Sequence, residues 1–159
     1  MKLSAQEEYG LRCLLQLASS PAGSVVTVRE IAAQEGLSGA YVEKLLRRLS
    51  RDELTRSVRG TKGGYLLQRP AEDITLGEVL RALGGMPKVQ LICTRFTGDR
   101  ATCVHYDNCG IRSVWSVVIH RLEQMLDQIR LSDLVQQDET AMGNTLQRQV
   151  SVSLRLPRA

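Results

Sequence analysis

The fold is decided by residues 27–51, TVREIAAQEGLSGAYVEKLLRRLSR, which predict two short helices joined by a tight turn. Thr27 and Glu30 form a capping box that begins the first helix, and Gly36 supplies the left-handed residue that ends it. Ser38 is a suitable N-cap for the second helix. Two such helices joined by a turn of about three or four residues are typical of a helix-turn-helix. The second helix carries an apolar stripe of Val42, Leu45, Leu46 and Leu49.

The residues that follow predict a β-hairpin. Residues 54–58 and 65–67 alternate as strands do, and the run RGTKGG at 59–64 provides a glycine-rich tip. A phosphate loop for a nucleotide does not fit, because G-x-x-x-x-G-K-[ST] is absent and no helix follows the glycines. A hairpin directly after a helix-turn-helix indicates a wing. We therefore expect a mainly α fold, with a winged helix-turn-helix DNA-binding domain over residues 1–83.

Basic residues concentrate in this domain. Residues 1–70 hold 11 Lys and Arg against 7 Asp and Glu, which accounts for the whole net charge of +4. A short basic run is often only a solvated helix face, but here it coincides with the helix and hairpin that would meet DNA. The candidate DNA-binding residues are Ser38, Tyr41, Glu43, Lys44, Arg47, Arg48, Arg59 and Lys62.

These candidates have different expected roles. The carboxylate of Glu43 could accept from a cytosine amino group in the major groove, and Lys44 could bind phosphate. Arg59 beside the glycine turn could enter a narrow minor groove. The hydroxyl of Tyr41 could contact a phosphate or a base. Its ring could equally well pack on the first helix.

A second functional segment is a long helix over about 111–130. Its apolar residues recur at alternating steps of four and three, the spacing of a coiled-coil seam. The stripe could cover the chain's own core, but a strict seam favours a partner helix. We expect a homodimer through residues 111–138, followed by a polar tail over 139–159. The dimerisation stripe is Ile111, Trp115, Val118, Leu122, Met125 and Ile129.

Cys93, Cys103 and Cys109 lie in a predicted sensor loop, 84–110, in which residues 88–109 show no helical or strand period. The chain has a charged N-terminus and no apolar run of membrane-spanning length, so we expect a cytoplasmic protein with reduced thiols. Four explanations stay open: an iron–sulfur cluster, a thiol–disulfide switch, a zinc site that includes His105, and incidental cysteines. Cys13 stands apart and is expected to be a buried small hydrophobe.

An enzyme is the rival class of function. C-x-x-C, H-E-x-x-H and a nucleophile elbow are all absent from the sequence, and only His105 and His120 could serve as histidine bases. We therefore predict that the chain is not an enzyme. A protein-binding adaptor is disfavoured by the basic bias of the wing and second helix.

The chain resembles the Rrf2 family of bacterial transcriptional regulators, typified by iron–sulfur repressors of the IscR and NsrR kind. The resemblance covers about residues 1–138 and rests on several motifs. These are MKLS at 1–4, the run from Ile31 through GLS at 36–38 to YVE at 41–43, SVRG and GGYLL in the wing, ITLGEV at 74–79, the three cysteines, Trp115, and LSDLV at 131–135.

This resemblance implies a homodimer on a palindromic operator and a 2Fe–2S or 4Fe–4S cluster bound by Cys93, Cys103 and Cys109. Some members use a His three residues after the last cysteine as fourth ligand, but Arg112 stands there. Others use an acidic residue near the start of helix one of the second subunit, which is Glu8 here, with His105 as second choice. The first cysteine gap is also wider than the common one. Cluster-free relatives exist, some of which respond to thiol metabolism.

Overall fold

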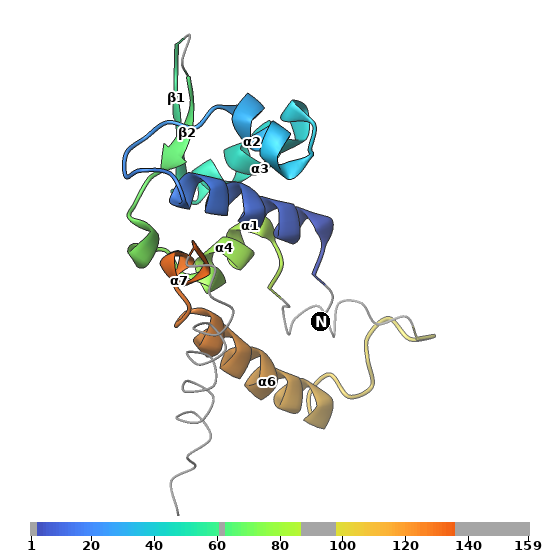
Figure 1. The fold of residues 1–159 in the computed structure, drawn as a ribbon. Coiled ribbons are helices and arrows are strands. Elements are labelled where there is room, and N and C mark those ends of the chain that lie inside the picture. The colour runs from blue at the N-terminus through green and yellow to red at the C-terminus, as the bar shows by residue number, and fades with distance from the viewer. Residues whose placement is uncertain (1–2, 61–62, 87–97, 136–159) are drawn as a thin grey trace, which may run out of the picture.

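The computed structural model describes residues 3–60, 63–86 and 98–135. Figure 1 shows a cluster of helices with a hairpin projecting from one end and a long helix set apart at the other. The elements are α1 (Ala5–Ala18), α2 (Val28–Glu35), α3 (Gly39–Arg51), β1 (Thr55–Val58), β2 (Gly64–Leu67), the 3₁₀ turn η1 (Ala71–Asp73), α4 (Leu76–Leu83), α6 (Gly110–Leu126) and α7 (Leu131–Val135).

Side-chain caps begin the helices where the sequence predicts them. The capping box predicted at Thr27 and Glu30 forms, and Ser4 and Thr75 begin α1 and α4 with capping boxes of the same kind, each with a glutamate three residues later. Gly36 ends α2 with a φ of 65°, a conformation that glycine adopts without steric cost. The predicted mainly α fold is confirmed, and its strands are limited to the hairpin in the part of the chain that the structure describes.

One hydrophobic core lies beneath α3. The predicted stripe of this helix is fully buried and packs with residues of α1, α4 and α7. Residues of α1 such as Leu14 and Leu17 pack beneath the same helix. Because four large side chains of α3 leave water together, the burial orients the opposite face of the helix outward. The stripe consists of Val42, Leu45, Leu46 and Leu49.

The wing is a short antiparallel pair. Thr55 of β1 is paired with Leu67 of β2, and Val58 with Gly64. Val26 forms two backbone hydrogen bonds of 2.9 Å with Tyr65, so the loop before α2 anchors the base of β2. Gly64 is required there, because a Cβ would collide with the backbone of Val26.

The long helix is shorter than expected. The sequence predicts it to about residue 130, but α6 ends at Leu126. Asp127 forms an ion pair with Arg81 of α4 at 2.6 Å, and the carbonyl of Ile129 accepts from the backbone N–H of Leu76 at 2.8 Å. The chain thus leaves the helix to lie beside the start of α4. No described helix is both long and apolar enough to span a bilayer.

Candidate nucleic-acid interface and cysteine segment

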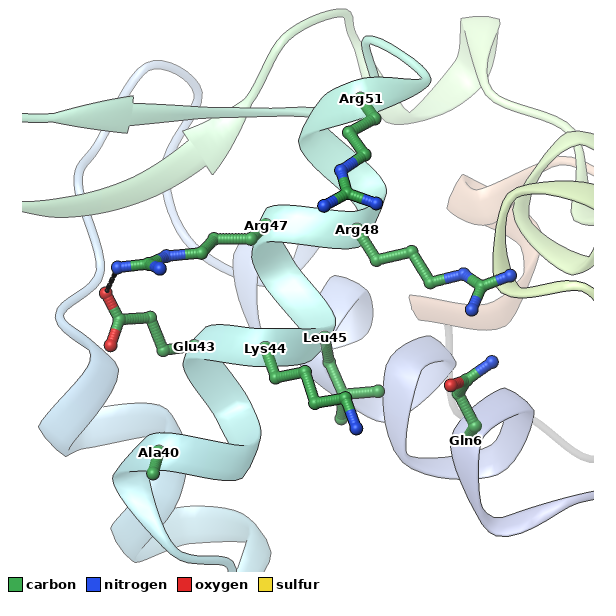
Figure 2. A pocket seen from close by; sticks show the side chains of 8 residues that line it. All are labelled: Gln6, Ala40, Glu43, Lys44, Leu45, Arg47, Arg48 and Arg51. Atoms are coloured by element: carbon green, nitrogen blue, oxygen red, sulfur yellow. Dashed lines mark hydrogen bonds and ion pairs between the residues drawn. The ribbon is translucent and has the colours of Figure 1, made fainter.

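The outward face of α3 is strongly basic. With its apolar stripe buried, this helix presents cations at positions 44, 47, 48 and 51 and one carboxylate, Glu43. Figure 2 shows the side chains of Glu43 and Arg47 directed to one side of α3 and those of Lys44 and Arg48 directed to the other, where Gln6 of α1 lies. They line an open cleft of about 360 Å³. The lining residues are Gln6, Ala40, Glu43, Lys44, Leu45, Arg47, Arg48 and Arg51.

The N-terminus of α3 is exposed, as a base-reading end must be. Ser38, Gly39 and Ala40 are all exposed, and the Ser38 hydroxyl accepts from the backbone N–H of Tyr41 at 3.3 Å. The ring of Tyr41 packs edge-on against Tyr9 of α1, with ring centroids 6.2 Å apart. The ring therefore has the packing role, which is one of the two interpretations that the sequence allows.

Glu43 and Arg47 are bound to each other. The guanidinium of Arg47 donates to Glu43 at 2.6 Å, one helical turn away. Hydrogen bonds to the carboxylate of Glu43, and secondarily to Tyr65 of β2, raise the pKa of Arg47. Arg47 is exposed and Glu43 is about half exposed, so breaking this ion pair costs little free energy.

Arg48 differs from its neighbours on α3. Its Nε donates to the carbonyl oxygen of Ala82 at 2.7 Å, at the end of α4, and the side chain is half-buried. Lys44 and Arg51 are exposed. Arg51 is not among the DNA-binding residues predicted from the sequence, but it lies two helical turns from Lys44 on the same helix and is also exposed.

At the wing, Arg59 is exposed and precedes Gly60, which has a φ of 118°. That backbone conformation favours glycine and turns the chain sharply at the hairpin tip. Lys62, the other predicted wing contact, lies outside the described residues.

The two described cysteines of the segment lie on either side of a short irregular stretch before α6. Cys103 and Cys109 are half-buried, and Cys93 lies outside the described residues. Cys109 is the N-cap of α6, where its Sγ accepts from the backbone N–H of Arg112 at 3.4 Å. Within the described ranges, no three His, Cys, Asp or Glu residues gather as metal ligands would.

The proposed fourth ligands lie on different elements. Glu8 lies on α1, partly exposed, and pairs with Arg12 at 2.9 Å. His105 is exposed in the stretch between the two described cysteines. Cys13 is fully buried in α1, and burial raises the pKa of its thiol to about 12. The expectation that Cys13 is a core residue is confirmed.

The predicted dimerisation stripe divides into two parts. At the N-terminal end of α6, Ile111, Trp115 and Val118 are 65%, 50% and 48% exposed. Toward the other end, Leu122 packs against a small cluster of Leu80, Met86 and Leu126, and Ile129 is buried. Among the residues that the structure describes, the chain's own side chains thus cover the C-terminal part of the stripe, and the N-terminal part is exposed.

Comparisons with known proteins identify the family of this chain. A family model described as Rrf2, iron-dependent transcriptional regulator, matches residues 3–137. The chain is 32% identical to IscR of Escherichia coli O1:K1, covering 87% of this chain and 83% of that protein. It is 33% identical to protein rrf2 of Nitratidesulfovibrio vulgaris, covering 85% and 87%.

Two solved structures share the fold along most of their length. The IscR of T. potens matches with a TM-score of 0.67 and 33% identity, covering 89% of this chain and 90% of that one. CymR, the global cysteine regulator of B. subtilis, matches with a TM-score of 0.65 and 27% identity, covering 85% and 96%. These matches confirm the winged-helix prediction and the prediction that the chain is not an enzyme. The chain belongs to the Rrf2 family of DNA-binding transcriptional regulators.

Proposed function

We propose that this regulator is a cytoplasmic homodimer that binds a palindromic operator and senses redox state, nitric oxide or iron–sulfur status through a cluster. Cys93, Cys103 and Cys109 would hold the cluster, and Glu8 of a second copy would complete the ligand set. The observation that carries the dimer is the uncovered end of α6, where five large apolar side chains are exposed together: Ile111, Val114, Trp115, Val117 and Val118. An apolar patch of this kind on a helix is typical of a protein–protein contact.

The described donors suit an iron–sulfur cluster. Thiolates are its usual ligands, and hydrogen bonds to their sulfurs tune its potential. Cys109 already accepts one from the backbone of α6. A carboxylate at Glu8 is a less common donor, which favours a cluster that is readily lost. When bound, the cluster would supply a group that reacts with oxidants or nitric oxide.

The chain's own residues offer a route from the cysteine segment to the DNA-reading helix. This segment begins where α4 ends, and side chains of α1 and α3 hold that end. Gln6 donates to the carbonyl of Leu83 at 2.5 Å and Arg48 to that of Ala82 at 2.7 Å. A change in the cysteine segment that moves the end of α4 would therefore act on α3, and the DNA affinities of the two states would differ.

Anaerobic purification followed by iron, sulfide and zinc analysis tests the ligand assignment. We expect iron and sulfide in the wild type, loss of both in Cys103→Ala, and their retention in Cys13→Ala, which removes a thiol from the core instead. Equal iron and sulfide in wild type and Cys103→Ala would contradict the assignment.

A cluster-free thiol regulator is the second candidate. It is supported by the likeness to CymR, of which one matching structure, from Staphylococcus aureus, is of an oxidized form. In that case the protein would carry neither iron nor sulfide, and peroxide would alter its DNA affinity through the cysteines. Zinc without sulfide would instead identify a zinc-binding regulator, the least favoured of the three.

A further inference from the structure

The elbow between α6 and α7, residues 127–130, is bound to the start of α4 by two backbone hydrogen bonds. The N–H of Leu76 donates to the carbonyl of Ile129 at 2.8 Å. The N–H of Leu131 donates to the carbonyl of Ile74 at 2.9 Å, and together the two bonds form an isolated antiparallel bridge. Ile74 and Leu131 are completely buried, so water does not compete for the second bond. The backbone of the elbow is therefore fixed to the winged domain.

A side-chain contact holds the same elbow. The guanidinium of Arg81 on α4 donates to both carboxylate oxygens of Asp127, at 2.6 and 3.3 Å. A contact through two parallel hydrogen bonds fixes the relative orientation of the two groups as well as their distance. Both side chains are partly exposed, so the ion pair adds little to the stability of the fold. What it constrains is the angle at which α6 meets α4.

Gly77 of α4 provides the space for this contact. A Cβ at this position would overlap the carboxylate of Asp127 and crowd the guanidinium of Arg81. Glycine inside a helix is ordinarily less favourable than alanine. The φ of Gly77 lies outside the left-handed region, so its backbone conformation does not require glycine. The feature that glycine supplies here is room for the carboxylate.

The elbow lies at the supported end of α6. Near that end, Leu122 and Leu126 pack with Leu80 and Met86 of the winged domain. Residues 113–118, toward the other end, are all exposed, and Figure 1 shows α6 extending away from α4 and α7. Because α6 has 17 residues and is about 25 Å long, a rotation of about 10° at the elbow moves its far end by about 4 Å.

We infer that Arg81, Asp127 and Gly77 determine which half-site spacing the regulator recognises in its operator. A dimer on a palindrome must place its two recognition helices in major grooves about one helical turn apart, or a multiple of it. Because the proposed dimer joins through the N-terminal end of α6, the path from one α3 to the other passes through both elbows. A fixed elbow makes other spacings costly, whereas a loose elbow accepts them. The inference rests on the proposed homodimer and is independent of the cluster.

The test compares DNA affinity across half-site spacings by fluorescence anisotropy. The reference duplex is selected from a random-sequence pool with the wild type, and further duplexes carry one or two extra central base pairs, each of which rotates one half-site by about 35°. Two added base pairs should lower the affinity of the wild type about 100-fold and that of Asp127→Ala only about 10-fold. Gly77→Ala should reduce the discrimination likewise, although it keeps both charges. Arg121→Gln, which removes a charge from exposed α6, should keep the wild-type ratio.

The ratio of affinities separates the elbow from a general structural effect, because lost stability lowers the affinity for every spacing equally. Adding Gly77→Ala to Asp127→Ala should not change the ratio further, since the carboxylate that it displaces is already gone. Sedimentation equilibrium tests the dimer separately. Dimeric elbow variants that keep the wild-type ratio, or a dimeric wild type that binds all spacings equally, would overturn the inference alone. A monomeric wild type would overturn the proposed homodimer, and the inference with it.

Discussion

Helices α3 and α6 contrast in how the chain supports them. The shorter one, α3, buries four large apolar side chains at no more than 1% exposure. The longer one, α6, buries only Ile119 and Leu126 and exposes five large apolar residues at its N-terminal end. The single chain therefore fixes the orientation of α3 by itself. The N-terminal end of α6, which follows the cysteines, stays exposed, as the proposed homodimer through this helix requires.

The largest predicted effect concerns α3, which the chain's own core holds. Leu46→Ala should lower the free energy of unfolding by about 3 kcal/mol, because it removes a fully buried side chain and leaves a cavity. Urea unfolding measures this decrease. Val117→Ala, on the exposed end of α6, is the matched comparison and should cost the protomer far less. Similar decreases for the two variants would remove the contrast between the helices.

The next predicted effect concerns the exposed end of α6. Trp115→Asp places a charge in the exposed apolar patch and should weaken dimerisation roughly 100-fold, about 2.7 kcal/mol. Ser116→Asp adds the same charge at the adjacent, exposed position outside the predicted stripe. Sedimentation equilibrium should show dimers for Ser116→Asp and monomers for Trp115→Asp at the same concentration. Dimers in both would place the interface elsewhere.

The smallest predicted effect is a decrease in stability at high pH that comes from the buried thiol of Cys13. The pKa of Cys13 is raised by burial from 9.0 to about 12, so folding favours the neutral thiol. Its contribution to stability is complete below the unfolded pKa and is lost as pH rises toward the folded one. At pH 10 the decrease should be about 1 kcal/mol. Unfolding of wild type and Cys13→Ala at about pH 8 and pH 10 measures it, and an equal pH dependence in the two would contradict the prediction.

The sequence predicts the winged helix-turn-helix domain well because the signals that fix its helices are local. Capping boxes at Ser4, Thr27 and Thr75 and the glycine at 36 act within one turn of the chain, and the stripe of α3 follows from helical period alone. The same period places the end of α6 too late, because the contacts that stop the helix lie far away in sequence, at Arg81 and Leu76.

The same difference between local and distant signals decides which parts of the candidate site the sequence predicts. The basic face of α3 is predictable from the spacing of its residues, whereas the bond from Arg48 to Ala82 joins residues 34 apart and carries no local pattern. The sequence predicts the packing of Tyr41 on Tyr9 only as one of two alternatives. Periodicity alone does not say whether a half-buried ring packs on a neighbouring helix or faces a ligand.

The proposed control of DNA binding by the cysteine segment is tested by the operator affinity of one anaerobic preparation before and after exposure to nitric oxide, with iron and sulfide determined on the same sample. We predict that the protein carries both elements at the start, and that losing the cluster changes affinity by about tenfold or more without unfolding the winged domain. A preparation that binds its operator equally well before and after would contradict the proposal that the cysteine segment controls the DNA-reading helix.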